Sequence, residues 1–513
     1  MPQYILAHDV GTGGNKAVLV DITGRVCATA FAPYPVHYPR PDWAEQEPED
    51  WWQAVATTSR QVLEQADVSP RDVLAMVHTT QLLGIIPVDG DGRPLRPAII
   101  WLDGRAPEQA ERIMRRFLGR RVFATLAGAE LSGKDGLAKL LWLKENEPQV
   151  YNGMSHFLDV NGYLLYRATG RQVFEISCAS AFCLDLKKKE WMRWLIRYIG
   201  LDERKFPPLV RSTDPVGGLT EEAARACGLL PGTPVFGGGG DAQGAAVGSG
   251  AVGEGDGHIY LGTSGWVGVV TRQTPTGRHG VATLQSADPN RALLFAEMET
   301  AGACLKWVAD EFYRHEQHDP AIPNVYALMD QKVETVPPGA DFLVCTPWMY
   351  GERAPVADTW VRSTFFNLSA DHTREHLLRA VYEGVAYNLR WLIEIVERSF
   401  GFPLPTLRVI GGGARGAPWM QIIADVTGRQ VETVAHAQEA GAVGMALVAA
   451  VGLGLYPSVE SLKGIIPVER QFAPQACNAQ VYNTLYHAYR RLYTCLRDLY
   501  REVNAVRFGE CRE

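Results

Sequence analysis

The chain has 513 residues, of which 46% are apolar and 21% charged, and its formal net charge is −7. This length exceeds what one hydrophobic core usually organises, so it predicts two domains, and the composition excludes a disordered or fibrous protein. The 50 basic and 57 acidic residues are mixed along the chain, which argues against nucleic acid and anionic membrane as partners.

The N-terminal residues predict a strand meander followed by alternating helices and strands. Apolar runs at residues 4–7, 16–20 and 26–31 flank a glycine-rich turn at residues 11–14. A helix is expected over residues 48–65, and strands over residues 73–79 and 85–88. This alternation is typical of the α/β class.

The second half opens in the same way as the first. A glycine-rich tract at residues 237–240 ends at Asp241, and a second glycine-rich stretch runs to Gly257. A strand over residues 258–261, a turn over residues 262–265 and a strand over residues 266–270 then repeat the strand, Gly-Thr turn and strand of the N-terminus. We therefore expect duplicated topology, with one domain over residues 1–248 and another over residues 249–513.

Two long amphipathic helices are expected near the C-terminus. Apolar residues keep helical spacing from Leu377 to Val396, and Gly401 stands where a C-terminal cap would be. A second apolar stripe runs from Val481 to Val503. A helix that covers the domain and a contact in a homodimer explain this second stripe equally well.

The two Gly-Thr turns are candidate phosphate sites. In the first, Asp9 precedes Gly11 and Thr12, and Lys16 follows on the next strand, so one turn combines a carboxylate, a hydroxyl and an ammonium. Tight bends expose backbone N–H groups to phosphate oxygens, and a carboxylate with phosphate usually holds Mg²⁺. The alternative is that both are plain hairpin turns, in which glycine supplies a positive φ.

A third glycine tract, residues 411–413, follows a strand expected over residues 407–410. Glycine there allows a ribose or a flat ring to approach the backbone closely. Gly411, Gly413 and Gly416 also satisfy the G-x-G-x-x-G pattern of dinucleotide folds. That reading is weak, because no clean acidic partner follows about twenty residues later.

The cysteines and the N-terminus favour the cytoplasm. The nine cysteines are odd in number, scattered, and form no C-x-x-C pair, which predicts reduced thiols and no zinc site. The first residues lack the charged start, apolar core and cleavage site of a signal peptide, and no apolar run reaches membrane-spanning length.

Several motifs together resemble the FGGY carbohydrate kinases, in particular their xylulokinase-like branch. The resemblance covers roughly residues 3–455 and follows the family's order. Its motifs are Asp9-Val10-Gly11-Thr12, residues 41–46, residues 96–105, residues 139–146, Gly238-Gly239-Gly240-Asp241, residues 261–265, residues 351–355, residues 411–415 and residues 439–444. A further signature fits at residues 363–383, except that Asn367 stands where the family usually has Gly.

The resemblance implies an actin-like, RNase H-like fold, in which two α/β domains of similar topology close a cleft on ATP and a small sugar. It implies that Asp241 is the general base that takes the proton from the attacking sugar hydroxyl, and that Asp9 and Asp241 hold Mg²⁺. The implied nucleotide-binding residues belong to the three glycine-containing segments and their neighbours: Gly11, Thr12, Gly13, Lys16, Gly262, Thr263, Gly302, Gly412, Gly413 and Ala414. An alternative for Asp241 is a helix N-cap.

The implied sugar-binding residues include several departures from the family. They are Gln81, Leu82, Leu83, Trp101, Asp103, Arg105, Asp241 and Ala242. Xylulokinases commonly have Met-His where this chain has Leu82-Leu83, and Asn where it has Ala242. Cys178 replaces a frequent Asp, and Gly13 replaces a Ser or Thr. Each loss of a polar group removes a contact worth roughly 0.5 to 1.5 kcal/mol.

The predicted function is ATP-dependent phosphorylation of a small ketose, most directly a pentulose such as D-xylulose. Another ketose or a polyol is the alternative acceptor. A nucleotide-gated sugar-binding protein that has lost phosphotransfer is an alternative of another class, although Asp9 and Asp241 argue against it. A chaperone-like ATPase is a third reading, and it would need an appended peptide-binding domain that the sequence lacks.

Overall fold

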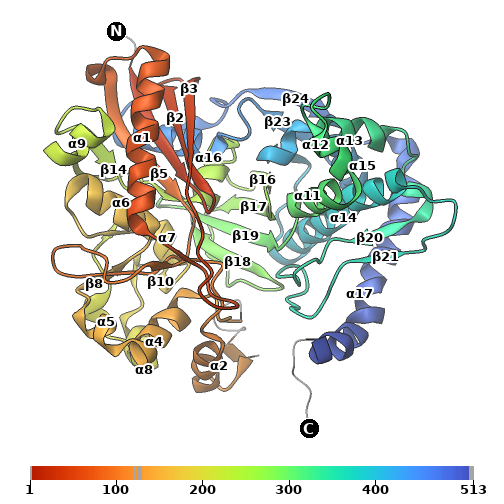
Figure 1. Ribbon diagram of the computed structural model, residues 1–513, viewed down its shortest axis with the longest axis horizontal. Coiled ribbons are helices and arrows are strands. Elements are labelled where there is room, and N and C mark those ends of the chain that lie inside the picture. Colours follow the sequence, from red (N-terminus) through yellow and green to blue (C-terminus); the bar gives the residue numbers. More distant parts are fainter. Residues whose placement is uncertain (1–2, 121, 124–129, 508–513) are drawn as a thin grey trace.

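Two mixed seven-stranded sheets organise the chain in the computed structural model, which describes residues 3–120, 122–123 and 130–507. Figure 1 shows the two sheets in two lobes. The first sheet has the order β13 (Pro215–Gly218), β14 (Pro234–Phe236), β5 (Val73–Thr80), β1 (Tyr4–Val10), β2 (Gly14–Asp21) and β3 (Val26–Pro33), and β15 (Gly239–Gly240) also pairs with β5. The second has the order β18 (Val281–Gln285), β19 (Ala292–Met298), β17 (Gly265–Thr271), β16 (Gly257–Leu261), β22 (Thr406–Ile410), β23 (Gln430–Val434) and β24 (Val468–Phe472).

The predicted repeat of strand, Gly-Thr turn and strand is confirmed. β1 and β2 form an antiparallel hairpin, and β1 also pairs in parallel with β5. In the second sheet, β16 and β17 form an antiparallel hairpin, and β16 pairs in parallel with β22. Each lobe therefore places one Gly-Thr turn at the end of a central strand.

The first sheet is covered by helices on both faces, and the partners of the neighbouring β1 residues show which face Asp9 occupies. Leu6 and Val10 belong to the apolar core that includes α1 (Pro48–Ala66), α6 (Val160–Thr169) and α9 (Glu221–Cys227). Ile5 and Ala7 instead pack with α10 (Asp241–Gly248) and α16 (Ala440–Gly452). Because side chains alternate along a strand, Asp9 lies on the face of Ile5 and Ala7, toward α16.

Helices α10 and α16 cross with their backbones in contact. A Cβ atom added at Gly248 would lie 1.7 Å from the carbonyl oxygen of Ala440, and one added at Gly444 would lie 2.1 Å from that of Gly244. No side chain fits at these points. Since α16 comes from the C-terminal half and packs on β1 and β5, the crossing joins the two halves of the chain.

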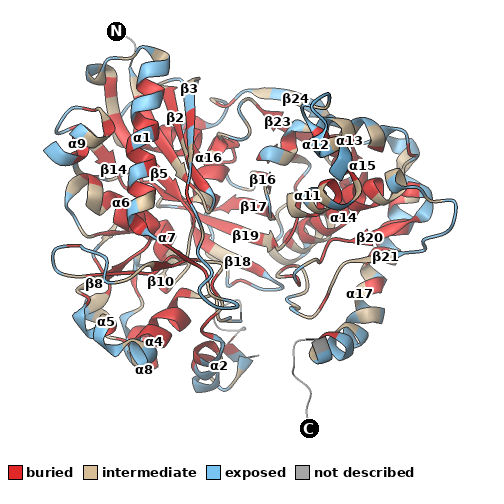
Figure 2. Ribbon diagram, viewed as in Figure 1, coloured by how far each residue is buried: buried red, intermediate tan, exposed pale blue. Residues whose placement is uncertain are grey.

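The second sheet packs against α11 (Gly302–Phe312), α14 (Arg374–Phe400) and α15 (Ala417–Thr427). Helix α14 confirms the predicted stripe, and Gly401 ends it with a φ of 77°. Helix α17 (Ala479–Arg507) buries Tyr482 and Tyr489 on this lobe but leaves Leu499 and Val503 more than half exposed. Figure 2 shows the buried interiors of both lobes.

Shorter elements complete the chain. The remaining helices are α2 (Pro107–Arg116), α4 (Gly136–Asn146), α5 (Pro148–Gly153), α7 (Ile176–Ser180), α8 (Arg193–Ile199), α12 (Arg314–His318) and α13 (Val325–Glu334). The short strands are β4 (Glu45–Gln46), β6 (Ile86–Val88), β7 (Ala98–Ile99), β8 (His156–Leu158), β9 (Phe174–Glu175), β10 (Leu184–Asp185), β11 (Glu190–Trp191), β12 (Leu209–Val210), β20 (Val344–Thr346) and β21 (Thr364–Phe366). Among the described residues, no helix has both the length and the apolar character needed to cross a lipid bilayer.

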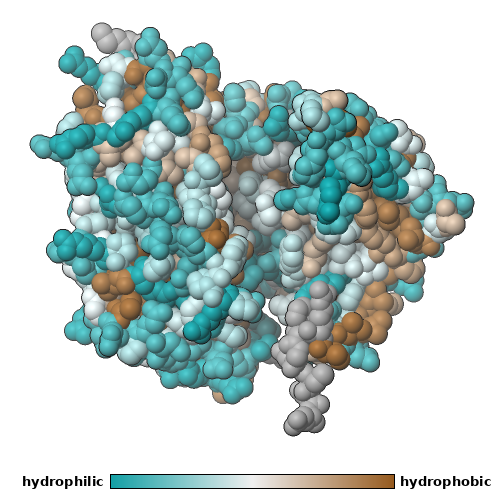
Figure 3. Space-filling model, in the orientation of Figure 1, coloured by the Kyte–Doolittle hydropathy of each residue, from teal (hydrophilic) through white to brown (hydrophobic). Residues whose placement is uncertain are grey.

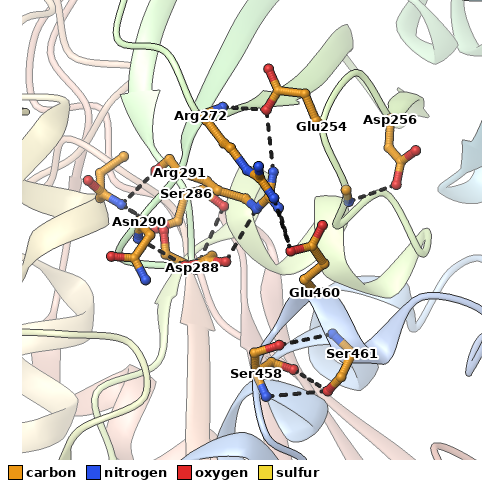
Figure 4. Close-up of polar contacts among 12 residues, drawn as sticks. Glu254, Asp256, Arg272, Ser286, Asp288, Asn290, Arg291, Ser458, Glu460 and Ser461 are labelled. Atoms are coloured by element: carbon orange, nitrogen blue, oxygen red, sulfur yellow. Dashed lines mark hydrogen bonds and ion pairs between the residues drawn. The ribbon is translucent and has the colours of Figure 1, made fainter.

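A buried arginine fixes the loop between β18 and β19 (Figure 4). The Arg291 side chain is 3% exposed and forms ion pairs with Glu254 at 3.4 Å, Asp288 at 3.4 Å and Glu460 at 2.7 Å. Glu460 belongs to the segment that follows α16. The cluster therefore ties the edge of the second sheet to the C-terminal part of the chain.

Candidate active site

The first Gly-Thr turn is held by side chains from other segments. Its backbone closes through a bond from the Gly11 amide to the Gly14 carbonyl of 3.1 Å. The Trp101 indole N–H donates to Thr12 Oγ1 at 2.8 Å, and the Gln46 amide donates to the Thr12 carbonyl at 2.8 Å. The Thr12 hydroxyl in turn donates to Gln81 Oε1 at 3.3 Å. The turn is thus connected to two segments that were predicted to bind the sugar.

The second Gly-Thr turn is held by the N-terminal end of α11. The Gly302 amide donates to the Gly262 carbonyl at 2.9 Å, and the amides of Ala301 and Ala303 donate to the Thr263 carbonyl at 3.0 and 3.1 Å. A Cβ atom at Gly302 would lie 2.5 Å from the Gly262 carbonyl oxygen. Glycine is therefore required here for close approach, and three of the predicted nucleotide-binding residues lie together.

The third glycine tract lies beside the segment that contacts Lys16. Gly411 has a φ of 90°, which favours glycine, and its amide donates to the Ala437 carbonyl at 2.8 Å. A Cβ atom at Gly412 would lie 3.3 Å from Gln438 Nε2, while Lys16 Nζ donates to the Gln438 carbonyl at 2.8 Å. Residues 436–439 thereby link β2 of the first sheet to the glycine tract after β22. Gly413 and Ala414 continue this tract beside Leu261 and Trp419.

Asp9 and Asp241 lie near one another, because Asp9 on β1 pairs with Thr79 of β5, and Gly240, which precedes Asp241, pairs with Thr80. Burial, together with the negative charges of Asp9 and Glu297, raises the pKa of Asp241 to about 7. Burial likewise raises the pKa of Asp9 to about 6, with opposing effects from Lys16 and Glu439. The phenol of Tyr260, which precedes the second turn, interacts electrostatically with both aspartates. Asp241 is therefore close to both predicted phosphate turns.

Asp241 lies at the start of a helix but is not its N-cap residue. Helix α10 starts at Asp241 itself, its N-cap is Gly240, and the Ala242 amide donates to Asp241 Oδ1 at 2.8 Å. This bond occupies one carboxylate oxygen. The bond orients the carboxylate at the start of the helix. The role of Asp241 as a general base stays a prediction.

The aspartate pair suits a cation that keeps most of its own water. The two carboxylates are half-buried and repel one another, and the described ion pairs give neither a cationic partner. Within the described residues, no group of three or more His, Cys, Asp or Glu side chains could enclose a metal. Mg²⁺ is commonly bound by one or two carboxylates together with water and phosphate, so the residues present fit it.

The predicted sugar segment at residues 81–84 lies beside Asp241. A Cβ atom at Gly240 would lie 2.6 Å from Leu82 Cδ2, so Leu82 packs against the residue before the aspartate. Gln81 is buried and donates to Gln46 Oε1 at 2.9 Å. Leu83 has a φ of 61°, a left-handed conformation that costs energy for a leucine.

Three other predicted sugar residues are engaged elsewhere. Arg105 is buried and donates to both Asp103 and Glu45, at 2.6 Å in each case. The Asp103 carboxylate also accepts from the Ala44 amide at 2.7 Å. Ala242 is buried in an apolar cluster with Val270. Direct contact of these residues with a substrate stays a prediction, and in this structure Asp103 and Arg105 support the loop that follows Trp101.

Sequence reasoning missed an acidic patch at the C-terminal end of β19, formed by Glu297 on the strand and Glu299 just after it. Glu297 lies near Asp241, and Arg353 forms ion pairs of 2.8 Å with both Glu297 and Glu299. Lys134 contributes a further ion pair to Glu299 at 3.2 Å. The available signal was a pair of glutamates, Glu297 and Glu299, two positions apart at the end of an otherwise apolar run.

Comparison with protein families extends over nearly the whole chain. The model described as "FGGY family of carbohydrate kinases, N-terminal domain" matches residues 4–248, and that of the C-terminal domain matches residues 257–453. The xylulose kinase of Bacillus subtilis is 32% identical over 508 residues, which is 98% of this chain and 99% of that protein. The gluconokinase of the same organism is 26% identical over 507 residues, 98% of each chain.

A solved structure provides the fold comparison. The crystal structure of xylulose kinase from Rhodospirillum rubrum superposes with a TM-score of 0.85 at 27% identity, over 97% of this chain and the whole of that one. The predicted two-domain actin-like fold and the predicted family resemblance are thereby confirmed.

Proposed function

Because this chain belongs to the FGGY family of carbohydrate kinases, we propose that it phosphorylates a hydroxyl group of a small ketose, with a pentulose such as D-xylulose as the expected acceptor. The protein is an ATP:sugar phosphotransferase that uses ATP and Mg²⁺. Another ketose or a polyol is the alternative acceptor, since the chain is also similar to gluconokinases and departs from the xylulokinase pattern at Leu82 and Leu83.

The observation that carries the proposal is the proximity of Asp9 and Asp241, which interact electrostatically across the ends of β1 and β15. Phosphoryl transfer requires positioning, neutralisation of charge and an in-line hydroxyl that loses its proton. Asp241 would accept that proton, because a carboxyl group whose pKa is about 7 is about half ionised at neutral pH, and its ionised form is basic enough to act. Asp9 would hold the cation, and the amides of the two Gly-Thr turns would bind the phosphate oxygens.

Mg²⁺, when held by Asp9 and Asp241, supplies the positive charge that offsets the phosphate oxygens. The chain's own residues do the rest. The turn at Gly262 and Thr263 would hold the triphosphate from the C-terminal lobe. The turn at Gly11 and Thr12 would hold it from the N-terminal lobe, while Trp101 and Gln81 connect that turn to the acceptor side.

A coupled ADP-release assay across pentuloses, other ketoses, polyols and aldonates tests the proposal. Turnover that depends on a ketose supports it, whereas sugar-independent hydrolysis would indicate an ATPase, and sugar binding without ADP release would indicate a binding protein. We expect Asp241→Asn to fold normally and to lower kcat by on the order of 10²- to 10⁴-fold. Asp498→Asn, at an 89% exposed site on α17, is the control. Unchanged turnover in Asp241→Asn would remove this residue from the mechanism.

We also propose that the protein forms a homodimer and that it resides in the cytoplasm. We place the boundary between its two domains after residue 248. Leu499, Val503 and Val506 form an exposed apolar stripe on the last turns of α17, and apolar residues gather on this lobe in Figure 3. Such a stripe is suited to a partner surface. The eight described cysteines are free thiols, as a reducing compartment requires. Sedimentation of the wild type and of Val503→Glu tests the dimer.

A further inference from the structure

Lys139, on α4, is a buried lysine without an acidic partner. Its side chain is fully buried, and the ion pairs of the described residues include none to Lys139. Lysine is almost never fully buried unless it is paired, because an ammonium loses its hydration in the interior. Because burial of an unpaired ammonium group destabilises the fold, we ask what the Lys139 side chain contributes in return.

The ammonium group instead contacts two backbone carbonyls from separate loops. Lys139 Nζ donates to the Ile100 carbonyl at 2.7 Å, with a longer contact of 3.5 Å to the Leu83 carbonyl. Ile100 immediately precedes Trp101, whose indole holds Thr12. Leu83 has the left-handed conformation noted above, so the ammonium group reaches the carbonyl of a strained residue.

Charged groups of both signs surround Lys139. Asp103 and Asp135 favour its charged form, while Arg105 and Lys134 oppose it, and Asp103 is already bonded to Arg105. Burial therefore dominates and lowers the pKa of Lys139 to about 7. The Lys139 side chain therefore carries a full or partial positive charge near neutral pH, although no carboxylate of the described residues forms an ion pair with it.

We propose that Lys139 is a positioning residue for the acceptor sugar: its ammonium draws the carbonyls of Leu83 and Ile100 to one point and so fixes the spacing between residues 81–84 and residues 101–105. Lys139 does not touch the substrate itself. The inference rests on the proposed function, because these two loops bind the acceptor only if the protein phosphorylates a sugar.

Stability and function should respond oppositely to removal of the ammonium. Lys139→Met keeps a chain of similar length and removes a buried charge. The Ile100 carbonyl keeps its bond from the Asp103 amide at 3.1 Å, so only the Leu83 carbonyl loses a partner. The thermal midpoint should therefore stay unchanged or rise. The acceptor loops would lose their common anchor and separate.

The experiment compares Lys139→Met with Lys144→Met by the ADP-release assay and by thermal unfolding. Lys144 lies on the same helix but is exposed, and it donates to the Gly200 carbonyl at 2.5 Å. We expect Lys139→Met to raise KM for the acceptor on the order of 10- to 100-fold, with KM for ATP nearly unchanged. Lys144→Met should leave both constants unchanged. Lys139→Arg, which keeps a cationic donor, should recover part of the loss.

Two results would overturn the inference while the kinase assignment stands. One is an unchanged acceptor KM in Lys139→Met. The other is a parallel loss for both substrates with a lowered thermal midpoint and no recovery in Lys139→Arg, which would indicate a structural role. A wild-type protein without sugar-dependent ADP release would overturn the proposed function, and the inference with it.

Discussion

The turn after β1 is held mainly by side chains, whereas the turn after β16 is held by backbone amides. Trp101, Gln46 and Gln81 all bond to the first turn, and each comes from a different segment of the N-terminal lobe. The second turn is fixed by three consecutive amides at the start of α11. The two hairpins have the same strand pairing but differ in the parts of the site to which they are connected. The first is connected to the acceptor side, and the second is a rigid support for the nucleotide.

Among the substitutions that compare the two turns, Gly302→Ala has the largest expected effect, because it adds a methyl group where the second turn has no room for one. In Gly302→Ala the added Cβ would meet the Gly262 carbonyl oxygen at 2.5 Å, so the second turn must shift. We expect kcat/KM for ATP to fall on the order of 10- to 100-fold, because small displacements of a phosphate-binding turn misalign the transferred group. Steady-state kinetics with ATP varied at saturating acceptor measure this effect.

Gly13→Ala in the first turn is the matched control. A Cβ atom at Gly13 has no neighbour within 4 Å, so kcat/KM for ATP should change less than about threefold. Equal effects of Gly302→Ala and Gly13→Ala would contradict the distinction between a backbone-held and a side-chain-held turn.

A smaller effect is expected from Trp101→Phe, which keeps the ring and removes the N–H donor to Thr12. The loss of one hydrogen bond should lower kcat/KM by about 3- to 10-fold. Because Thr12 connects the two sides of the site, both the acceptor and ATP should be affected. Thr12→Ser, which keeps the hydroxyl, should remain close to the wild type. A defect confined to one substrate would mean that the first turn does not couple them.

The smallest expected effect concerns stability and pH. The folded-state pKa of Lys139 is about 7, below the usual 10.5, so the unfolded chain binds this proton more tightly. The destabilisation is complete below about pH 7 and is lost as the pH rises toward 10.5. The gain in unfolding free energy from Lys139→Met should therefore be larger at pH 7 than at pH 9 in urea titrations. A gain independent of pH would show that Lys139 is charged equally in both states.

Local patterns predicted the elements well. The helix expected over residues 48–65 is α1 (Pro48–Ala66), and the glycine after the stripe of α14 is its left-handed cap. Both Gly-Thr hairpins were also predicted, because two short apolar runs joined by a glycine-rich turn specify a hairpin locally. Asp9 and Asp241 were identified through the family resemblance, since spacing along the chain does not bring residues 232 positions apart together.

The supporting contacts could not be predicted from the sequence. In the sequence, Lys139 is simply a polar residue at the start of a helix, and its burial depends on loops 39 and 56 residues away. Asp103 and Arg105 were expected to meet the sugar, but two residues of opposite charge two positions apart can also bond to each other, as they do here. Only the packed structure decides between these outcomes.

The bare backbone crossing of α10 and α16 has a practical consequence for protein engineering. At Gly248 and Gly444 every other amino acid would collide with main-chain atoms, so substitution at these positions would force the helices apart. No side chain at those positions can select one sugar over another. Mutant libraries that aim to change the preferred acceptor can therefore keep the α10–α16 crossing constant and vary the loops at residues 81–84 and 101–105.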